Sequence, residues 1–146
     1  MSKKTEFIEI YQTYIKRDGA KEFLDELRTL TQVIILSDTF TQFAAPLMKK
    51  LGWPTIFCNT LVVEEDGSIS GYKMRTADSK YSTVKALQSV GYDTIAAGDS
   101  YNDLRMIRGG KAGFLFKSTE KIKSENPDLP AFDTFDDLLD AIKTNL

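Results

Sequence analysis

Short apolar runs alternate with amphipathic stretches along the 146 residues, and this alternation predicts strands that alternate with helices. The apolar runs have the length of strands buried on both faces and cover residues 31–36, 55–59, 94–97 and 112–116. Helices are predicted over residues 20–30, 40–51, 80–90 and 98–107, and from residue 135 onward. Because strands and helices alternate, the predicted fold class is α/β, with a mainly parallel sheet flanked by helices.

Local patterns add detail to this outline. Asp66-Gly67 lies between two strand-like runs, 61–65 and 68–72, which predicts a small β-hairpin. Residues 7–15 carry apolar and aromatic side chains that fit a helix or a strand, so residues 1–18 form an N-terminal segment with two alternative structures. The chain has the length of one domain and contains no repeats, so we expect a single domain over residues 1–146.

The composition excludes several functional classes. The chain has no histidine, which excludes a Ser-His-Asp triad, a Cys-His pair and a His-based zinc site. Its net charge of −2 gives no reason to expect nucleic acid or an anionic membrane as a partner. No apolar run approaches the ~20 residues of a membrane span, and the single cysteine, Cys58, suits a reducing compartment. We therefore expect a cytoplasmic protein.

Polar side chains suited to phosphate chemistry follow two of the predicted strands. Ser37 and Asp38 come after the first strand, and Asp99 and Asp103 come after the third. Lys80 begins the helix that leads to the third strand. Because ligands bind at the carboxyl ends of parallel strands, we expect these side chains to meet at one edge of the sheet. Two carboxylates suit Mg²⁺, while a hydroxyl, backbone amides and an ammonium group suit phosphate.

Each of these residues also has a purely structural interpretation. Ser37 fits the N-cap of the next helix, and Asp103 fits a helix N-terminus because of the helix dipole. Lys80 taken alone fits a solvated lysine. The functional interpretation rests on the joint pattern and not on any one residue.

Two segments resemble motifs of a known family. Residues 33–40, Val-Ile-Ile-Leu-Ser-Asp-Thr-Phe, resemble motif II of the haloacid dehalogenase superfamily, and residues 96–103, Ala-Ala-Gly-Asp-Ser-Tyr-Asn-Asp, resemble its motif IV. Lys80 stands where motif III places its lysine. Within the superfamily, the chain is similar to the phosphoserine phosphatase and homoserine phosphotransferase branch, from about Tyr11 to its C-terminus.

The resemblance implies a Mg²⁺-dependent reaction on a small phosphorylated metabolite such as phosphoserine. By this likeness, Ser37 binds the transferring phosphate, with Asp38 and Thr39 beside it in motif II. Lys80 stabilises the phosphate and the charge on the nucleophile. Ser37 and Lys80 are thus the implied catalytic residues of this chain.

The resemblance also implies the metal ligands and two further contacts. Asp99 corresponds to a magnesium ligand, and Asp103 supports the metal directly or through water. Asn102 corresponds to an asparagine that orients the phosphate or the lysine. Arg75 contacts the substrate in one interpretation and is a solvated hairpin arginine in the other.

The sequence departs from the family pattern at motif I. That motif, Asp-x-Asp or Asp-x-Glu, supplies the nucleophile and the general acid/base, and a helical cap follows it. No Asp-x-Asp occurs in these 146 residues, and Glu64-x-Asp66 falls in the predicted hairpin turn. The resemblance therefore implies a HAD-like (Rossmann-like) sheet that lacks its central strand. Residues 5–15, direct pairing of the flanking strands, or another chain could fill this position.

Three hypotheses follow from this departure. The first is a phosphatase-type domain that binds Mg²⁺ weakly and is inactive alone. The second is a non-catalytic module that binds phosphate and Mg²⁺ or a protein partner, as a homodimer or with a complementing chain. The third, a receiver-like domain that accepts a phosphoryl group, lacks an aspartate at a central strand end. The joint motifs favour the first hypothesis.

Overall fold

The computed structural model describes residues 19–146, which fold as two compact units. One unit ends at Ala77, and the other spans Asp78–Leu146. The predictions for residues 1–18, including the entry of residues 5–15 into a sheet, lie outside the described residues. The arrangement of one continuous domain stays a prediction.

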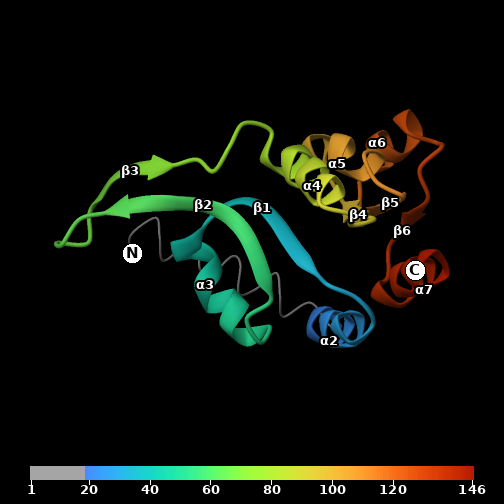
Figure 1. Cartoon of the computed structure of the whole chain (residues 1–146), viewed down its shortest axis with the longest axis horizontal. Coiled ribbons are helices and arrows are strands. Elements are labelled where there is room, and N and C mark those ends of the chain that lie inside the picture. The colour runs from blue at the N-terminus through green and yellow to red at the C-terminus, as the bar shows by residue number, and fades with distance from the viewer. Residues whose placement is uncertain (1–18) are drawn as a thin grey trace. The chain divides into compact units, whose positions relative to one another are not determined.

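In its described part, from residue 19 onward, the first unit combines two helices with a sheet of mixed direction (Figure 1). Its elements are α2 (Ala20–Leu30), β1 (Ile34–Phe40), α3 (Thr41–Lys50), β2 (Thr55–Val63) and β3 (Ile69–Lys73). The strand order is β1-β2-β3, with β1 parallel to β2 and β3 antiparallel to β2. Helix α3 lies along β1 and β2, and the β2–β3 hairpin extends past it.

One face of α3 forms the core of the first unit. Its buried residues follow the i, i+3, i+4, i+7 spacing of a helix face and are Ala44, Leu47, Met48 and Leu51. Leu24 of α2, Ile35 of β1 and Ile56 of β2 pack against this face. Burying a side chain such as that of Leu47 contributes about 1.5–3 kcal/mol, which holds the helix on the sheet.

Strand β1 continues further than the sequence predicted. Residues 37–39 do not cap α3, because the strand runs to Phe40, which occupies the N-cap position without a side-chain hydrogen bond. Leu36 pairs with Phe57 and Phe40 pairs with Asn59, so residues 37–39 of β1 face the single residue Cys58 of β2. Residues 37–39 therefore form a bulge, which we call the β1 bulge.

The predicted hairpin is confirmed, although its first strand is longer than expected. Residues 55–59 and 61–65 were predicted as separate strands, but the structure joins most of them in the single strand β2. The turn is closed by the Glu64 amide, which donates to the Ser68 carbonyl at 2.8 Å. Gly67 adopts a positive φ of 86°, which explains the glycine at this position.

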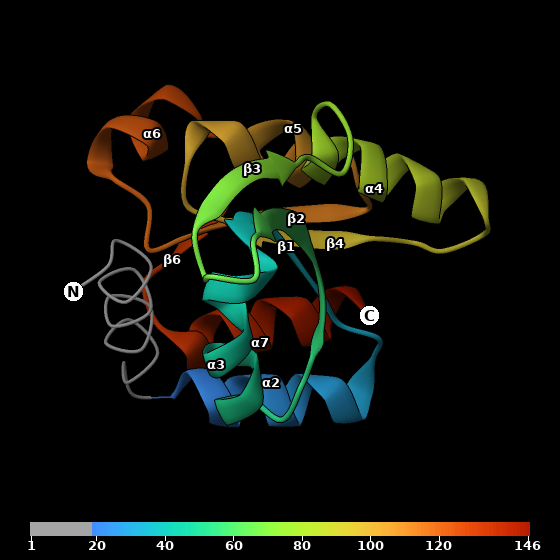
Figure 2. The ribbon, with the colours of Figure 1, turned by 90° about the vertical axis from the view of Figure 1, so that its left-hand side faces the viewer.

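The second unit is a parallel sheet with helices on both faces (Figure 2). Its elements are α4 (Ser79–Ser89), β4 (Ile95–Gly98), a 3₁₀ turn η1 (Tyr101–Asp103), α5 (Leu104–Arg108), β5 (Ala112–Phe116), α6 (Glu120–Glu125), β6 (Ala131–Phe132) and α7 (Phe135–Asn145). The strand order is β4-β5-β6. Helices α4 and α5 lie over one face and α7 lies over the other.

Close packing of α5 on β5 defines the core of the second unit. Ile107 of α5 and Leu115 of β5 are among the most buried side chains, at 1% and 0% exposed. A Cβ atom on Gly113 would lie 2.0 Å from the carbonyl oxygen of Ile107, so this approach requires glycine. The last helix, predicted from residue 135 onward, is capped by Thr134, whose hydroxyl accepts from the Asp137 amide at 3.2 Å. No helix among the described residues has the length and apolar character that a membrane crossing needs.

Candidate functional site

A buried ion pair stands at the carboxyl end of β4. Lys80 lies in the first turn of α4, and Asp103 closes the 3₁₀ turn that follows β4. The Lys80 Nζ donates to Asp103 Oδ1 at 2.6 Å, and both side chains are shielded from solvent. The structure therefore excludes the interpretation of Lys80 as a solvated surface lysine.

The carboxylate of Asp103 also organises the turn after β4. Its Oδ2 accepts from the backbone amides of Asp99 and Ser100 at 3.1 and 3.2 Å. It accepts in addition from the Ser100 hydroxyl at 3.0 Å. Burial acts to raise the pKa of Asp103, but the hydrogen bond and charge of Lys80, with the bonds from Ser100, hold that pKa below its ordinary value.

Asp99 has the opposite electrostatic setting. Its side chain is exposed, while its amide is held by Asp103. Partial desolvation, followed by the charge of Asp103, raises the pKa of Asp99, and the charge of Lys80 opposes this only in part. Asn102 is also exposed, and its side-chain oxygen accepts from the Ser100 hydroxyl. The exposed polar side chains of this turn thus include those of Asp99 and Asn102.

These residues fit a metal ion only in part. Asp99 offers a solvent-facing carboxylate of the type that Mg²⁺ binds. The oxygens of Asp103 already accept four hydrogen bonds, which suits indirect support of a metal better than direct coordination. No cluster of three or more His, Cys, Asp or Glu side chains occurs among residues 19–146. The described residues therefore suit a largely hydrated ion held mainly by Asp99.

In the first unit, the β1 bulge brings together the three motif II residues. Thr39 donates its backbone amide to the Ser37 hydroxyl at 3.2 Å, and Asp38 is exposed. The hydroxyl of Thr39 is buried without a hydrogen-bond partner, alone in this respect among the described side chains. A buried hydroxyl without a partner costs about 1–3 kcal/mol, so the bulge suits an additional oxygen ligand.

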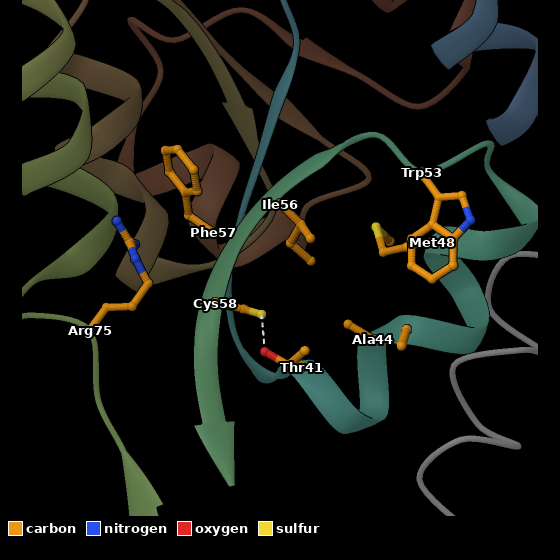
Figure 3. A pocket seen from close by; sticks show the side chains of 9 residues that line it. Thr41, Ala44, Met48, Trp53, Ile56, Phe57, Cys58 and Arg75 are labelled. Carbon is orange, nitrogen blue, oxygen red and sulfur yellow. Dashed lines mark hydrogen bonds between the residues drawn. The ribbon is translucent and has the colours of Figure 1, made fainter.

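Arg75 follows β3 and lies beside β2. Its guanidinium stands over the ring of Phe57, with its carbon 4.9 Å from the ring centroid. Figure 3 shows both side chains on one side of β2, with Met48 on the other. They border a cavity of about 220 Å³ at β2, which is otherwise lined by Thr41, Ala44, Ala45, Met48, Trp53, Ile56 and Cys58. Arg75 is exposed, and its guanidinium lies over the Phe57 ring.

Sequence reasoning missed Asn59, whose buried side chain links the β1 bulge to Arg75. Its Nδ2 donates to the Asp38 carbonyl at 3.2 Å, and its Oδ1 accepts from the Arg75 amide at 3.0 Å. The available signal was a polar residue at the end of the apolar run 55–59. The structure thus gathers two residue sets, one around the bulge and one around Lys80, each within its own unit.

In the turn after β4, Lys80 is bonded to Asp103, the second of the two aspartates in residues 96–103. A family model described as haloacid dehalogenase-like hydrolase matches residues 3–110. The chain belongs to this family. The predicted HAD-like α/β fold is thereby confirmed.

Two relatives place the chain in the phosphoserine phosphatase-like branch of the family. Phosphoserine phosphatase ThrH of Pseudomonas aeruginosa is 45% identical over 130 residues, which cover 89% of this chain and 63% of the relative. A phosphoserine phosphatase of Pseudomonas syringae pv. tomato is 46% identical over 121 residues, which cover 83% of this chain and 51% of the relative. The chain thus spans between half and two thirds of the length of these relatives.

A solved structure supports the fold. A substrate-bound phosphoserine phosphatase complex aligns with a TM-score of 0.68 at 24% identity and covers 92% of this chain and 68% of that one. At this level of identity the likeness concerns the fold. The α/β arrangement of this HAD-like chain is therefore shared with a phosphoserine phosphatase.

Proposed function

We propose that this chain forms part of a magnesium-dependent phosphatase for a small phosphorylated metabolite such as phosphoserine. Family membership and two relatives named phosphoserine phosphatase support the reaction class and the substrate. The observation that carries the proposal is the buried Lys80–Asp103 pair, which holds an ammonium group next to the exposed carboxylate of Asp99. Burying such a pair costs desolvation energy, so it contributes little to stability, whereas its ammonium group is suited to neutralising a phosphate.

We assign roles to the chain's own residues on this basis. Ser37 and Thr39 donate their hydroxyls to phosphate oxygens, with Asp38 in the same bulge, and Arg75 adds positive charge for the substrate. Lys80 neutralises the phosphate, and Asn102 orients it. The unpartnered hydroxyl of Thr39 supports the first assignment.

Asp99 is the proposed direct magnesium ligand in this scheme. Asp103 supports the site by holding Lys80 and the turn. Magnesium, when bound, would neutralise charge on the phosphate, and we expect its binding to be weak. Weak binding follows from the single solvent-facing carboxylate that the turn offers, because Mg²⁺ sheds its water reluctantly.

We also propose that these 146 residues are inactive alone and require a complementing strand. They contain no Asp-x-Asp, so the aspartate nucleophile of the family motif is not among them. Within the described residues, β1 pairs only with β2, and β4 pairs only with β5. Each of these strands thus keeps one edge on which a parallel strand from another chain could pair. Such a strand would also deliver the nucleophile.

The test mixes the chain with an N-terminal segment of a related phosphatase that carries the Asp-x-Asp strand. Phosphate release from phosphoserine should require both pieces and Mg²⁺, and it should disappear in Asp99→Asn and Lys80→Met. Residues 1–15 should be deleted in a parallel sample, since they could compete for the same position. Absence of both complex and phosphate release in both samples would refute complementation. Turnover by the chain alone that Asp99→Asn abolishes would refute the proposed inactivity.

A non-catalytic interaction module is the second candidate, favoured by apolar exposure on and just after β3. Ile69, Tyr72 and Met74 are 48%, 67% and 58% exposed, which is a large apolar surface for one hairpin. The free thiol of Cys58 agrees with the cytoplasmic location that we propose for either candidate. Light scattering measures the oligomeric state and helps to separate the two candidates. A homodimer that dissociates in Tyr72→Ser, together with no complementation by the Asp-x-Asp segment, would favour the interaction module.

A further inference from the structure

The side chain of Asn59 joins two segments that the fold would otherwise leave separate. It is 1% exposed, which is rare for an amide side chain. Its nitrogen binds the backbone of Asp38 and its oxygen binds the backbone of Arg75. We call these two hydrogen bonds the Asn59 bridge.

The position of Asn59 in the sheet explains why a bridge is needed there. Asn59 is the last residue of β2 that pairs with β1, and the next residue, Thr60, is the first that pairs with β3. The bulge takes residues 37–39 out of the ladder, so the Asp38 carbonyl needs another donor. Arg75 lies beyond the end of β3 at Lys73, so its amide needs another acceptor.

The main chain of Asn59 is fixed as well. The hydroxyl of Thr41, the first residue of α3, donates to the Asn59 carbonyl at 3.1 Å. The residue is therefore held by three segments: the β1 bulge, the start of α3 and the strand exit after β3. A side chain held in this way transmits the position of one segment to the others.

We propose that Asn59 is a positioning residue that fixes Arg75 relative to the phosphate-binding β1 bulge. This inference rests on the proposed function, because it takes Ser37 and Thr39 of the bulge as phosphate contacts. Arg75 then supplies the charge that selects an anionic substrate, with its backbone held by Asn59 and its guanidinium held over Phe57. Loss of the bridge should release the bulge and Arg75 together.

Two substitutions of Asn59 separate positioning from general stability. Asn59→Leu has nearly the same size and removes both hydrogen bonds. Asn59→Asp keeps the acceptor for the Arg75 amide but, when ionised at neutral pH, loses the donor to Asp38. The matched control is Gln42→Leu, which also removes two backbone hydrogen bonds on β2, those to the Leu61 amide and carbonyl at 3.0 and 2.9 Å.

The first measurement is amide hydrogen exchange in the whole chain. In Asn59→Leu, the amides of Arg75 and Thr39 should both exchange about tenfold faster or more, as expected when such bonds are lost. In Asn59→Asp, the Arg75 amide should stay protected, while the Thr39 amide should exchange faster than in the wild type. Gln42→Leu should leave both amides protected. The inference would be overturned if both amides exchanged as fast in Gln42→Leu as in Asn59→Leu. It would also be overturned if the Arg75 amide stayed protected in Asn59→Leu.

The second measurement is an NMR titration with inorganic phosphate. The wild type and Gln42→Leu should show shifts at residues 37–39 with the same affinity, and Asn59→Leu should bind about tenfold more weakly. Wild-type phosphate affinity in a folded Asn59→Leu or Asn59→Asp chain would refute the positioning role of Asn59 but not the proposed phosphate contacts. Absence of any phosphate shift in the wild type would instead refute the proposed phosphate contacts, so the two failures are distinguishable.

Discussion

Replacement of Asp103 by asparagine should destabilise the protein strongly. The Lys80 and Asp103 side chains are only 13% and 7% exposed, and their charged atoms lie 2.6 Å apart. Asp103→Asn keeps the size of the side chain but removes the charge of the carboxylate that accepts from the buried Lys80 ammonium. Removal of one partner of a buried pair typically costs about 3–5 kcal/mol of the free energy of unfolding. The hydrogen bonds from the Asp99 and Ser100 backbone amides can also be accepted by the asparagine oxygen. The loss of unfolding free energy therefore reports mainly the missing charge.

The chain offers a matched control in the Lys21–Asp25 pair of α2. Its charged atoms are also 2.6 Å apart, but its side chains are 54% and 50% exposed. Solvent screens such a pair, so Asp25→Asn should cost only about 0.3–0.5 kcal/mol. Urea unfolding followed by circular dichroism measures both variants, provided that the dependence on urea concentration stays unchanged. Similar losses in the two variants would refute the argument from burial.

The pH dependence gives an independent check on the same ion pair. Because the folded-state pKa of Asp103 is lowered, its contribution to stability is present above the ordinary carboxyl pKa. That contribution is lost as the pH falls through the lowered pKa. The stability difference between the wild type and Asp103→Asn should therefore be full at neutral pH and shrink in acid. A difference that stays constant down to the acid transition would contradict this origin.

Two further predictions concern single contacts in the second unit, at Gly98 and at Arg108. Gly98→Ala should cost about 1–3 kcal/mol, because its Cβ would lie 2.6 Å from Asp103 Oδ2; Gly71→Ala, with nothing within 4 Å, should cost much less in the same urea assay, and equal costs would contradict the clash. Arg108→Gln should raise the pKa of Asp128 towards its ordinary value, because the hydrogen bond from Arg108 is the main cause that lowers it. An NMR titration of the Asp128 carboxyl carbon that shows no change would contradict that cause.

Elements with a strong local signal could be predicted from the sequence. The helix expected at 80–90 is α4, Ser79–Ser89, and Gly91 after it has the positive φ of a helix end. The strand expected at 112–116 is β5, Ala112–Phe116, where a short apolar run has the length of a buried strand. In these segments local propensity and tertiary packing agree, so the pattern alone was sufficient.

Elements decided by tertiary pairing could not be predicted. Residues 37–39 form a cap-like Ser-Asp-Thr sequence, but pairing of Phe40 with Asn59 in β2 keeps them in the strand. Helix α6, Glu120–Glu125, buries only Ile122 and so shows no apolar periodicity. Asn59 could not be recognised either, because both of its partners are backbone groups distant in sequence.

The two units share one structural feature near the end of a strand. In each, a buried polar side chain holds backbone groups next to exposed residues: Asp103 holds the amide of Asp99, and Asn59 holds the carbonyl of Asp38. Buried polar groups persist only when their hydrogen bonds are satisfied, so Asn59 and Asp103 constrain the local backbone tightly. Asp99 and Asp38 are exposed, so solvent reduces the cost of their charges. Stability losses should therefore follow the buried members, whereas losses of ligand affinity without unfolding should follow Asp99 and Asp38.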